Sequence, residues 1–132
     1  MKGHIPERDG VWIGLMILEF MAKAGKTLEE LIQMVYEEVG SFAFDRDDLH
    51  ISQQVKEDVI QKCHGDKFTA FGSLTIDRTE KLDGFKYYLN NNTWIMIRPS
   101  GPEPVLRVYC EAAGRVTARE TLDIVRKELL GS

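Results

Sequence analysis

The apolar segment at residues 11–24 restricts most strongly what this chain can fold into. It has no proline and ends at Gly25, which predicts a helix closed by a left-handed residue. Its apolar side chains would point in nearly every direction around the axis, a pattern typical of a helix buried on all sides. A chain of 132 residues rarely surrounds such a helix, so we expect it to need contacts beyond this chain. The residues concerned are Val11, Trp12, Ile13, Leu15, Met16, Ile17, Leu18, Phe20 and Met21.

The second predicted helix begins at a capping box formed by Thr27 and Glu30 and ends at Gly40. It carries one apolar stripe, so with the first helix it is expected to form a helical hairpin. The pattern changes after Gly40, where helices give way to mixed strands and helices. We therefore place a domain boundary there, with one unit at residues 1–40 and another at 41–132.

The second unit shows strands framed by two further helices. Ser52 is expected to cap one helix, and Thr117 with Glu120 the last one. Residues 93–97 and 105–110 predict two strong strands, with a proline-rich loop between them. The chain should be an α+β protein, an antiparallel sheet with helices against one side, preceded by the helical hairpin. The inner face of the helix after Ser52 is expected to be Val55, Val59, Ile60 and Cys63.

Composition argues against several classes of partner. Hydrophobic residues make up 43% and charged residues 29% of the chain, which is ordinary for a soluble globular protein. The formal net charge of −4 offers no positive field for a nucleic acid, so none is expected as a partner. The acidic residues Asp45, Asp47 and Asp48 lack the other ligands of a calcium loop and are interpreted as a solvated turn.

The sequence favours a cytoplasmic location. Cys63 and Cys110 have no metal-binding or CxxC spacing, which indicates reduced thiols. Residues 1–10 are too polar for a signal peptide. The apolar run behind them is broken by Glu19 and is too short to cross a bilayer, so no membrane is expected.

The loop between the two strong strands has the residues of an anion site. Arg98 ends one strand and Arg107 lies on the next, so a hairpin would bring both guanidinium groups to the same end of the sheet. Between them, Ser100 offers a hydroxyl and Gly101 an accessible backbone N–H, both suited to phosphate oxygens. Spacing alone also fits a solvated turn whose arginines form surface ion pairs, and that alternative is the more common one.

Residues 94–111 resemble the phosphate-binding loop in the last domain of the α-D-phosphohexomutases, the family of phosphoglucomutases and phosphomannomutases. That family has the pattern R-x-S-G-T-E-P followed by an arginine. Residues 3–10, with the helix behind them, are similar to a stretch in the family's third domain. The resemblance covers nearly the whole chain, with residues 1–40 like the end of the third domain and 41–132 like the fourth.

The resemblance implies a defined reaction and a role for this loop. Family members move a phosphoryl group between the 1- and 6-positions of a hexose through a phosphoserine enzyme and a bisphosphate intermediate. Their fourth domain holds the phosphate that is not reacting, which here implies a phosphate or phosphosugar held by four residues. Those residues are Arg98, Ser100, Gly101 and Arg107.

The resemblance also implies what this chain lacks. His4 and Arg8 match a segment near the reacting phosphate and are weaker candidates. Pro102 stands where relatives usually have threonine, so one hydroxyl and one N–H are missing. The phosphoserine motif and the loop that binds Mg²⁺ belong to upstream domains of the parent enzyme, so this chain alone is not expected to catalyse. The sugar that the parent would prefer does not follow from these residues.

Three classes of function are left open. The first is the phosphate-binding part of a mutase whose upstream domains are missing. The second is a free-standing module that binds phosphosugars or other anions. The third is a module that self-associates through the first helix.

Overall fold

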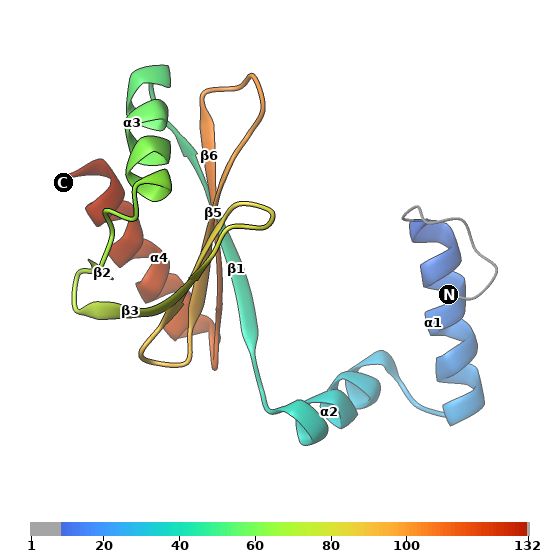
Figure 1. The fold of residues 1–132 in the computed structure, drawn as a ribbon. Helices are drawn as coiled ribbons and strands as arrows, with labels where there is room; N and C mark the ends of the chain where they lie inside the picture. Colours follow the sequence, from blue (N-terminus) through green and yellow to red (C-terminus); the bar gives the residue numbers. More distant parts are fainter. Residues whose placement is uncertain (1–8, 132) are drawn as a thin grey trace. The chain divides into compact units, whose positions relative to one another are not determined.

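The chain divides into two compact units, residues 1–40 and 41–132, and the computed structural model in Figure 1 describes residues 9–131. In the first unit, helix α1 spans Gly10–Ala24 and helix α2 spans Leu28–Val39. The carboxylate of Asp9 accepts a hydrogen bond from the N–H of Trp12 at 2.9 Å and caps α1. Gly25 ends that helix with φ +62°. The predicted capping box at the start of α2 is also confirmed.

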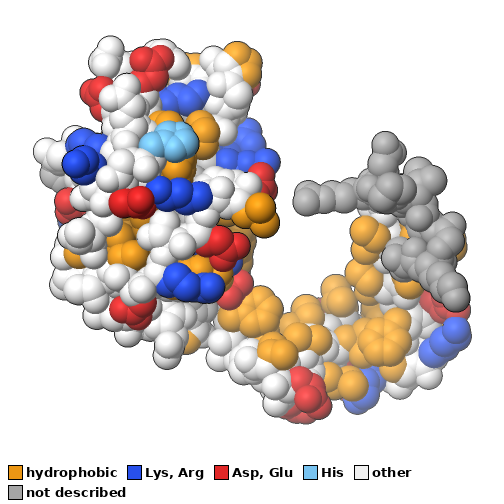
Figure 2. All heavy atoms as spheres, viewed as in Figure 1, with side chains coloured by type: hydrophobic (Ala, Val, Ile, Leu, Met, Phe, Trp, Pro, Cys, Tyr) orange, Lys and Arg blue, Asp and Glu red, His pale blue; other side chains and the backbone are white. Residues whose placement is uncertain are grey.

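The first unit leaves most of its apolar surface exposed. Helix α1 has no buried residue, and α2 buries only Leu31. The side chain of Leu18 on α1 is 60% exposed, and that of Phe20 is 56% exposed. Figure 2 shows hydrophobic side chains gathered along this unit. The described part of α1 therefore has the exposed surface that its sequence pattern predicted.

The second unit is a six-stranded antiparallel sheet with two helices on one side (Figure 1), which confirms the α+β prediction. The strand order is β1-β6-β5-β4-β3-β2, so the first and last strands in the chain are neighbours. Helix α3 spans Gln53–His64 and helix α4 spans Arg115–Leu130. The strands are β1 Ala43–His50, β2 Ala70–Phe71, β3 Leu74–Glu80, β4 Phe85–Leu89, β5 Trp94–Pro99 and β6 Val105–Ala112.

The core lies between the sheet and these two helices. Side chains alternate along the strands, so Ile95, Ile97 and Val108 face the helices and are almost completely buried. Val59 from α3 and Val125 from α4 meet them there. Burying an aliphatic side chain of this size contributes about 1.5–3 kcal/mol. The neighbouring strands β5 and β6 are thus anchored by buried side chains at the base of the loop that joins them.

Two local predictions were wrong. Helix α4 begins at Arg115, behind Gly114, and not at a capping box of Thr117. The N–H of Ala118 bonds to the carbonyl of Gly114 at 3.0 Å and Ala118 is fully buried, so packing decides where this helix starts. The expected acidic turn at residues 45–48 is instead part of strand β1, whose residues pair with β6 along their whole length.

The inner face of α3 also differs from the prediction by one residue. Val55 is 36% exposed, whereas Lys56 is only 5% exposed. Val59 and Cys63 are buried as expected. The helix is therefore rotated so that a lysine, and not a valine, faces the sheet at its first turn.

Candidate phosphate-binding loop

The β5–β6 hairpin places Arg98 and Arg107 directly opposite each other. They are register partners, and Pro99 pairs with Leu106 at the next position. Because Ile97 and Val108 face the helices, the two arginines lie on the other face of the sheet. Residues directly opposite on antiparallel strands have Cβ atoms about 4.5–5.5 Å apart, where like charges destabilise the sheet.

Little in the described chain compensates these two charges. Arg98 lies 3.4 Å from a carboxylate oxygen of Asp83, but both side chains are largely exposed, so the pair contributes little. Asp48 lies opposite Arg107 on β1, but its carboxylate pairs with Arg46 at 3.1 Å. The Nε of Arg107 is buried and has no hydrogen-bond partner among the described residues. Within residues 9–131, the site therefore combines an arginine that has an unsatisfied Nε with an arginine that is only weakly paired.

The loop itself is ordered by its own hydrogen bonds. The N–H of Ser100 donates to the carbonyl of Val105 at 3.0 Å, and the N–H of Val105 donates to the carbonyl of Glu103 at 2.8 Å. The hydroxyl of Ser100 donates to the carboxylate of Glu103 at 3.1 Å. A Cβ atom at Gly101 would meet no atom within 4 Å, so the chain alone gives no steric reason for this glycine. Its backbone is accessible from outside.

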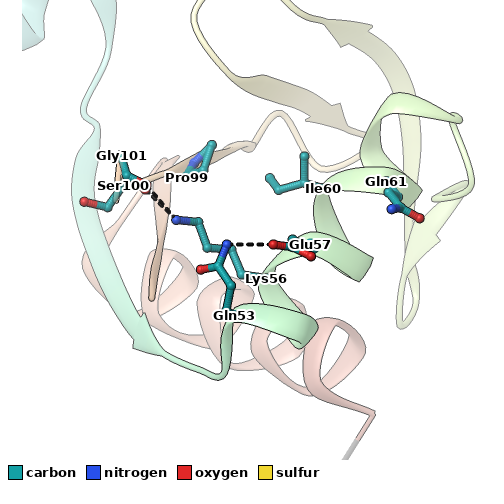
Figure 3. A pocket seen from close by; sticks show the side chains of 8 residues that line it. All are labelled: Gln53, Lys56, Glu57, Ile60, Gln61, Pro99, Ser100 and Gly101. Atoms are coloured by element: carbon teal, nitrogen blue, oxygen red, sulfur yellow. Dashed lines mark hydrogen bonds between the residues drawn. The ribbon is translucent and has the colours of Figure 1, made fainter. Parts of the chain in front are cut away.

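Lys56 holds the loop from the helix side and was not among the residues predicted from the sequence. Its ammonium donates to the carbonyls of Ser100 at 2.6 Å, Gly101 at 3.0 Å and Glu103 at 2.7 Å. Figure 3 shows the side chain reaching from α3 to the loop, beside an open hollow of about 420 Å³. The signal that could have revealed it is a lysine one turn before Val59 within an apolar stripe.

Comparisons with known proteins agree with this architecture. The family model described as phosphoglucomutase/phosphomannomutase, C-terminal domain, matches residues 46–128. The chain belongs to the phosphoglucomutase/phosphomannomutase family. The model of that family's alpha/beta/alpha domain III matches residues 1–39. The predicted family and the C-terminal position of the fragment are confirmed.

Curated members of the phosphoglucomutase/phosphomannomutase family align with most of the chain. A phosphoglucosamine mutase from Methanocaldococcus jannaschii is 31% identical over 115 residues, which cover 87% of this chain and 24% of the relative. A phosphoglucosamine mutase from Methanococcus maripaludis is 35% identical over 79% of this chain and 21% of the relative. A phosphoglucomutase/phosphomannomutase from Thermococcus kodakarensis is 30% identical over 89% of this chain and 23% of the relative. The chain thus spans about a quarter of the length of these relatives.

The described residues of this phosphohexomutase segment do not fit a metal ion. Residues 9–131 contain no group of three His, Cys, Asp or Glu side chains that could hold one. The acidic residues of β1 are occupied otherwise, because the Asp47 carboxylate accepts two hydrogen bonds of 2.8 Å from Arg119. These hydrogen bonds hold the pKa of Asp47 below its usual range.

The two cysteines and the other residues singled out in the sequence add no further reactive group among the described residues. Burial raises the pKa of the Cys63 thiol and raises that of Cys110 to about 12, so both are poor nucleophiles at neutral pH. His4 and Arg8 lie outside the described residues. Within residues 9–131, no helix is both long and apolar enough to cross a membrane.

Proposed function

We propose that this chain is the C-terminal part of a phosphohexomutase and that its β5–β6 loop binds the substrate phosphate that is not reacting. The parent enzyme would interconvert the 1- and 6-phosphates of a hexose, as an intramolecular phosphotransferase. One observation carries the proposal: Arg107, whose buried Nε has no hydrogen-bond partner among residues 9–131, lies directly opposite Arg98 at the base of the loop.

A bound phosphate would remove the electrostatic conflict at this site. Two guanidinium groups on one face of a sheet repel each other, whereas a dianion between them makes both charges favourable. The Ser100 hydroxyl, now bonded to Glu103, could turn to a phosphate oxygen, and the accessible Gly101 N–H could donate to another. Arginine forks match phosphate oxygens, so the site suits a phosphate better than a single chloride ion.

The chain should bind but not catalyse. In the parent, upstream domains would supply the phosphoserine and the Mg²⁺ site; residues 9–131 contain no group of three His, Cys, Asp or Glu side chains that could hold the metal ion. Mg²⁺ would stabilise charge on the transferring phosphoryl group there. The exposed face of α1 would be covered by the rest of the third domain, or by a second copy when this chain is alone.

Titration with inorganic phosphate, followed through backbone amide NMR shifts, tests the site. We expect shifts centred on residues 98–107, and a Kd about ten-fold weaker or more in Arg107→Ala and Arg98→Ala, since a charge-assisted hydrogen bond contributes about 1.5–3 kcal/mol. Arg126→Ala is the matched control, because Arg126 is an exposed arginine that belongs to helix α4 and not to the loop or its two strands. Shifts scattered over the surface, or an unchanged Kd in Arg107→Ala, would refute the proposal.

A second candidate, self-association through α1, is favoured by the exposure of its apolar side chains. Light scattering of the pure chain measures it directly. A dimer that dissociates in a Leu18→Lys variant would support this arrangement for the isolated chain. A monomer at high concentration would exclude it.

A further inference from the structure

Lys56 is an unusual residue to find almost completely buried without a carboxylate. It is 5% exposed and forms no ion pair among the described residues. Burial of an ammonium is unfavourable unless its three N–H groups are all satisfied. Here each of the three has an acceptor, and every acceptor is a backbone carbonyl of the same loop, at Ser100, Gly101 and Glu103.

The direction of these carbonyls fixes the direction of the loop's N–H groups. In a trans peptide the carbonyl of one residue and the N–H of the next point in opposite directions. The carbonyl of Ser100 points at Lys56, so the N–H of Gly101 points away from it. The other two carbonyls precede Pro102 and Pro104, which have no N–H. Of the three peptide units that Lys56 holds, only one presents a donor, and that donor belongs to Gly101.

We propose that Lys56 is the positioning residue of the phosphate-binding loop, and that it aims the Gly101 N–H at the bound phosphate. This inference rests on the proposed function, because it assigns the donor geometry of the same site. Lys56 acts from the side of α3 and does not itself contact the anion. Its three hydrogen bonds hold a loop whose prolines cannot donate backbone hydrogen bonds. Its positive charge, on the helix side of the loop, also favours an anion on the opposite side.

Two substitutions at position 56 distinguish a role of Lys56 in positioning the loop from an effect of its positive charge alone. An arginine at position 56 keeps the positive charge, but its planar fork cannot converge on three carbonyls as an ammonium does. A methionine keeps much of the length of the side chain and removes both the charge and the donors. If Lys56 positions the loop, the arginine variant should bind phosphate as weakly as the methionine variant. If only the positive charge matters, the arginine variant should bind phosphate as tightly as the wild type.

The experiment uses the full chain with Lys56→Met, Lys56→Arg and the control Lys62→Met, which changes an exposed lysine of the same helix. The line width of Gly101 and the amide exchange of Ser100, whose N–H bonds to the carbonyl of Val105, are measured first without phosphate, and sheet amides such as those of Ile95 and Val108 report that the fold is intact. Inorganic phosphate is then titrated. We expect a broadened Gly101 resonance, faster exchange of the Ser100 amide and a roughly ten-fold weaker Kd in both Lys56 variants, with Lys62→Met like the wild type.

Each result bears on one of the two proposals. An unchanged Gly101 amide with a Kd within two-fold of the wild type in Lys56→Met overturns the positioning role, as does full recovery of the Kd in Lys56→Arg. If Lys56→Met loses the sheet amides, Lys56→Arg alone decides. If the wild type does not bind phosphate, the proposed function fails, and the line width of Gly101 and the exchange of the Ser100 amide without phosphate still test whether Lys56 orders the loop.

Discussion

Replacing Pro102 by threonine should strengthen phosphate binding at the β5–β6 loop. Pro102 stands where the resemblance leads us to expect threonine, and it supplies neither an N–H nor a hydroxyl. The carbonyl of Gly101 bonds to Lys56 at 3.0 Å. The N–H of a residue 102 other than proline would therefore point away from Lys56, beside the N–H of Gly101. The substitution adds a second backbone donor on the side where we place the phosphate.

The size of the effect follows from two opposing contributions. A hydrogen bond to a charged group contributes about 1.5–3 kcal/mol. Loss of the proline makes the unbound loop more flexible, which costs about 0.4–1 kcal/mol. The difference is about 0.5–2.6 kcal/mol, which lowers the Kd by a factor of about two to eighty. The hydroxyl of threonine can add a further, smaller contribution.

Isothermal titration calorimetry with inorganic phosphate on wild type, Pro102→Thr and Pro102→Ala checks this reasoning. The alanine variant restores the N–H without a hydroxyl and loses the same rigidity, so it separates the two donors. We expect Pro102→Ala to bind more tightly than wild type and Pro102→Thr to bind at least as tightly as Pro102→Ala. Equal or weaker binding in both variants, with an intact sheet spectrum, would show that the amide at position 102 does not face the phosphate.

Other assays and substitutions test the proposed lack of mutase activity and the stability of the fold. Pure chain should show no mutase turnover with glucose 1-phosphate in a coupled assay, and turnover abolished by chelation would contradict the role proposed for it. Gly72→Ala should destabilise the protein by about 1–2 kcal/mol in chemical denaturation, because Gly72 has φ +55° and a Cβ there would lie 2.9 Å from Ile124. Gly101→Ala, with open space around it, is the control with little effect on stability. Asp47→Asn should cost about 1 kcal/mol at pH 7. Because folding lowers the pKa of Asp47, its contribution is present above the unfolded pKa of about 4 and is lost as the pH falls through the lower folded pKa, so the difference from wild type in thermal unfolding should shrink as the pH falls below about 4.

Features set by neighbouring residues were predictable from the sequence. The left-handed end at Gly25 and the capping box of Thr27 depend on contacts within four residues, and both were predicted correctly. The opposed placement of Arg98 and Arg107 likewise follows from a single hairpin. Their role in binding phosphate remains a prediction.

Features set by distant residues were not predictable in this way. Aspartates are poor strand formers, so residues 45–48 suggested a turn. Pairing with β6 and the contact of Asp47 with Arg119, 72 residues away, override that preference. Lys56 was missed for the same reason, since its carbonyl partners lie 44 to 47 residues further along the chain.

Strand β1 lies at an edge of the sheet, with β6 on one side and no strand of residues 9–131 on the other. The free backbone groups of an edge strand can recruit strands from other molecules and start aggregation. Four consecutive charged residues, Asp45, Arg46, Asp47 and Asp48, lie along this edge. A second copy that paired its own β1 there in parallel register would bring like charges opposite each other, and any strand would have to accept a densely charged neighbour. This charged run thus disfavours parallel pairing of the edge with a second copy of β1.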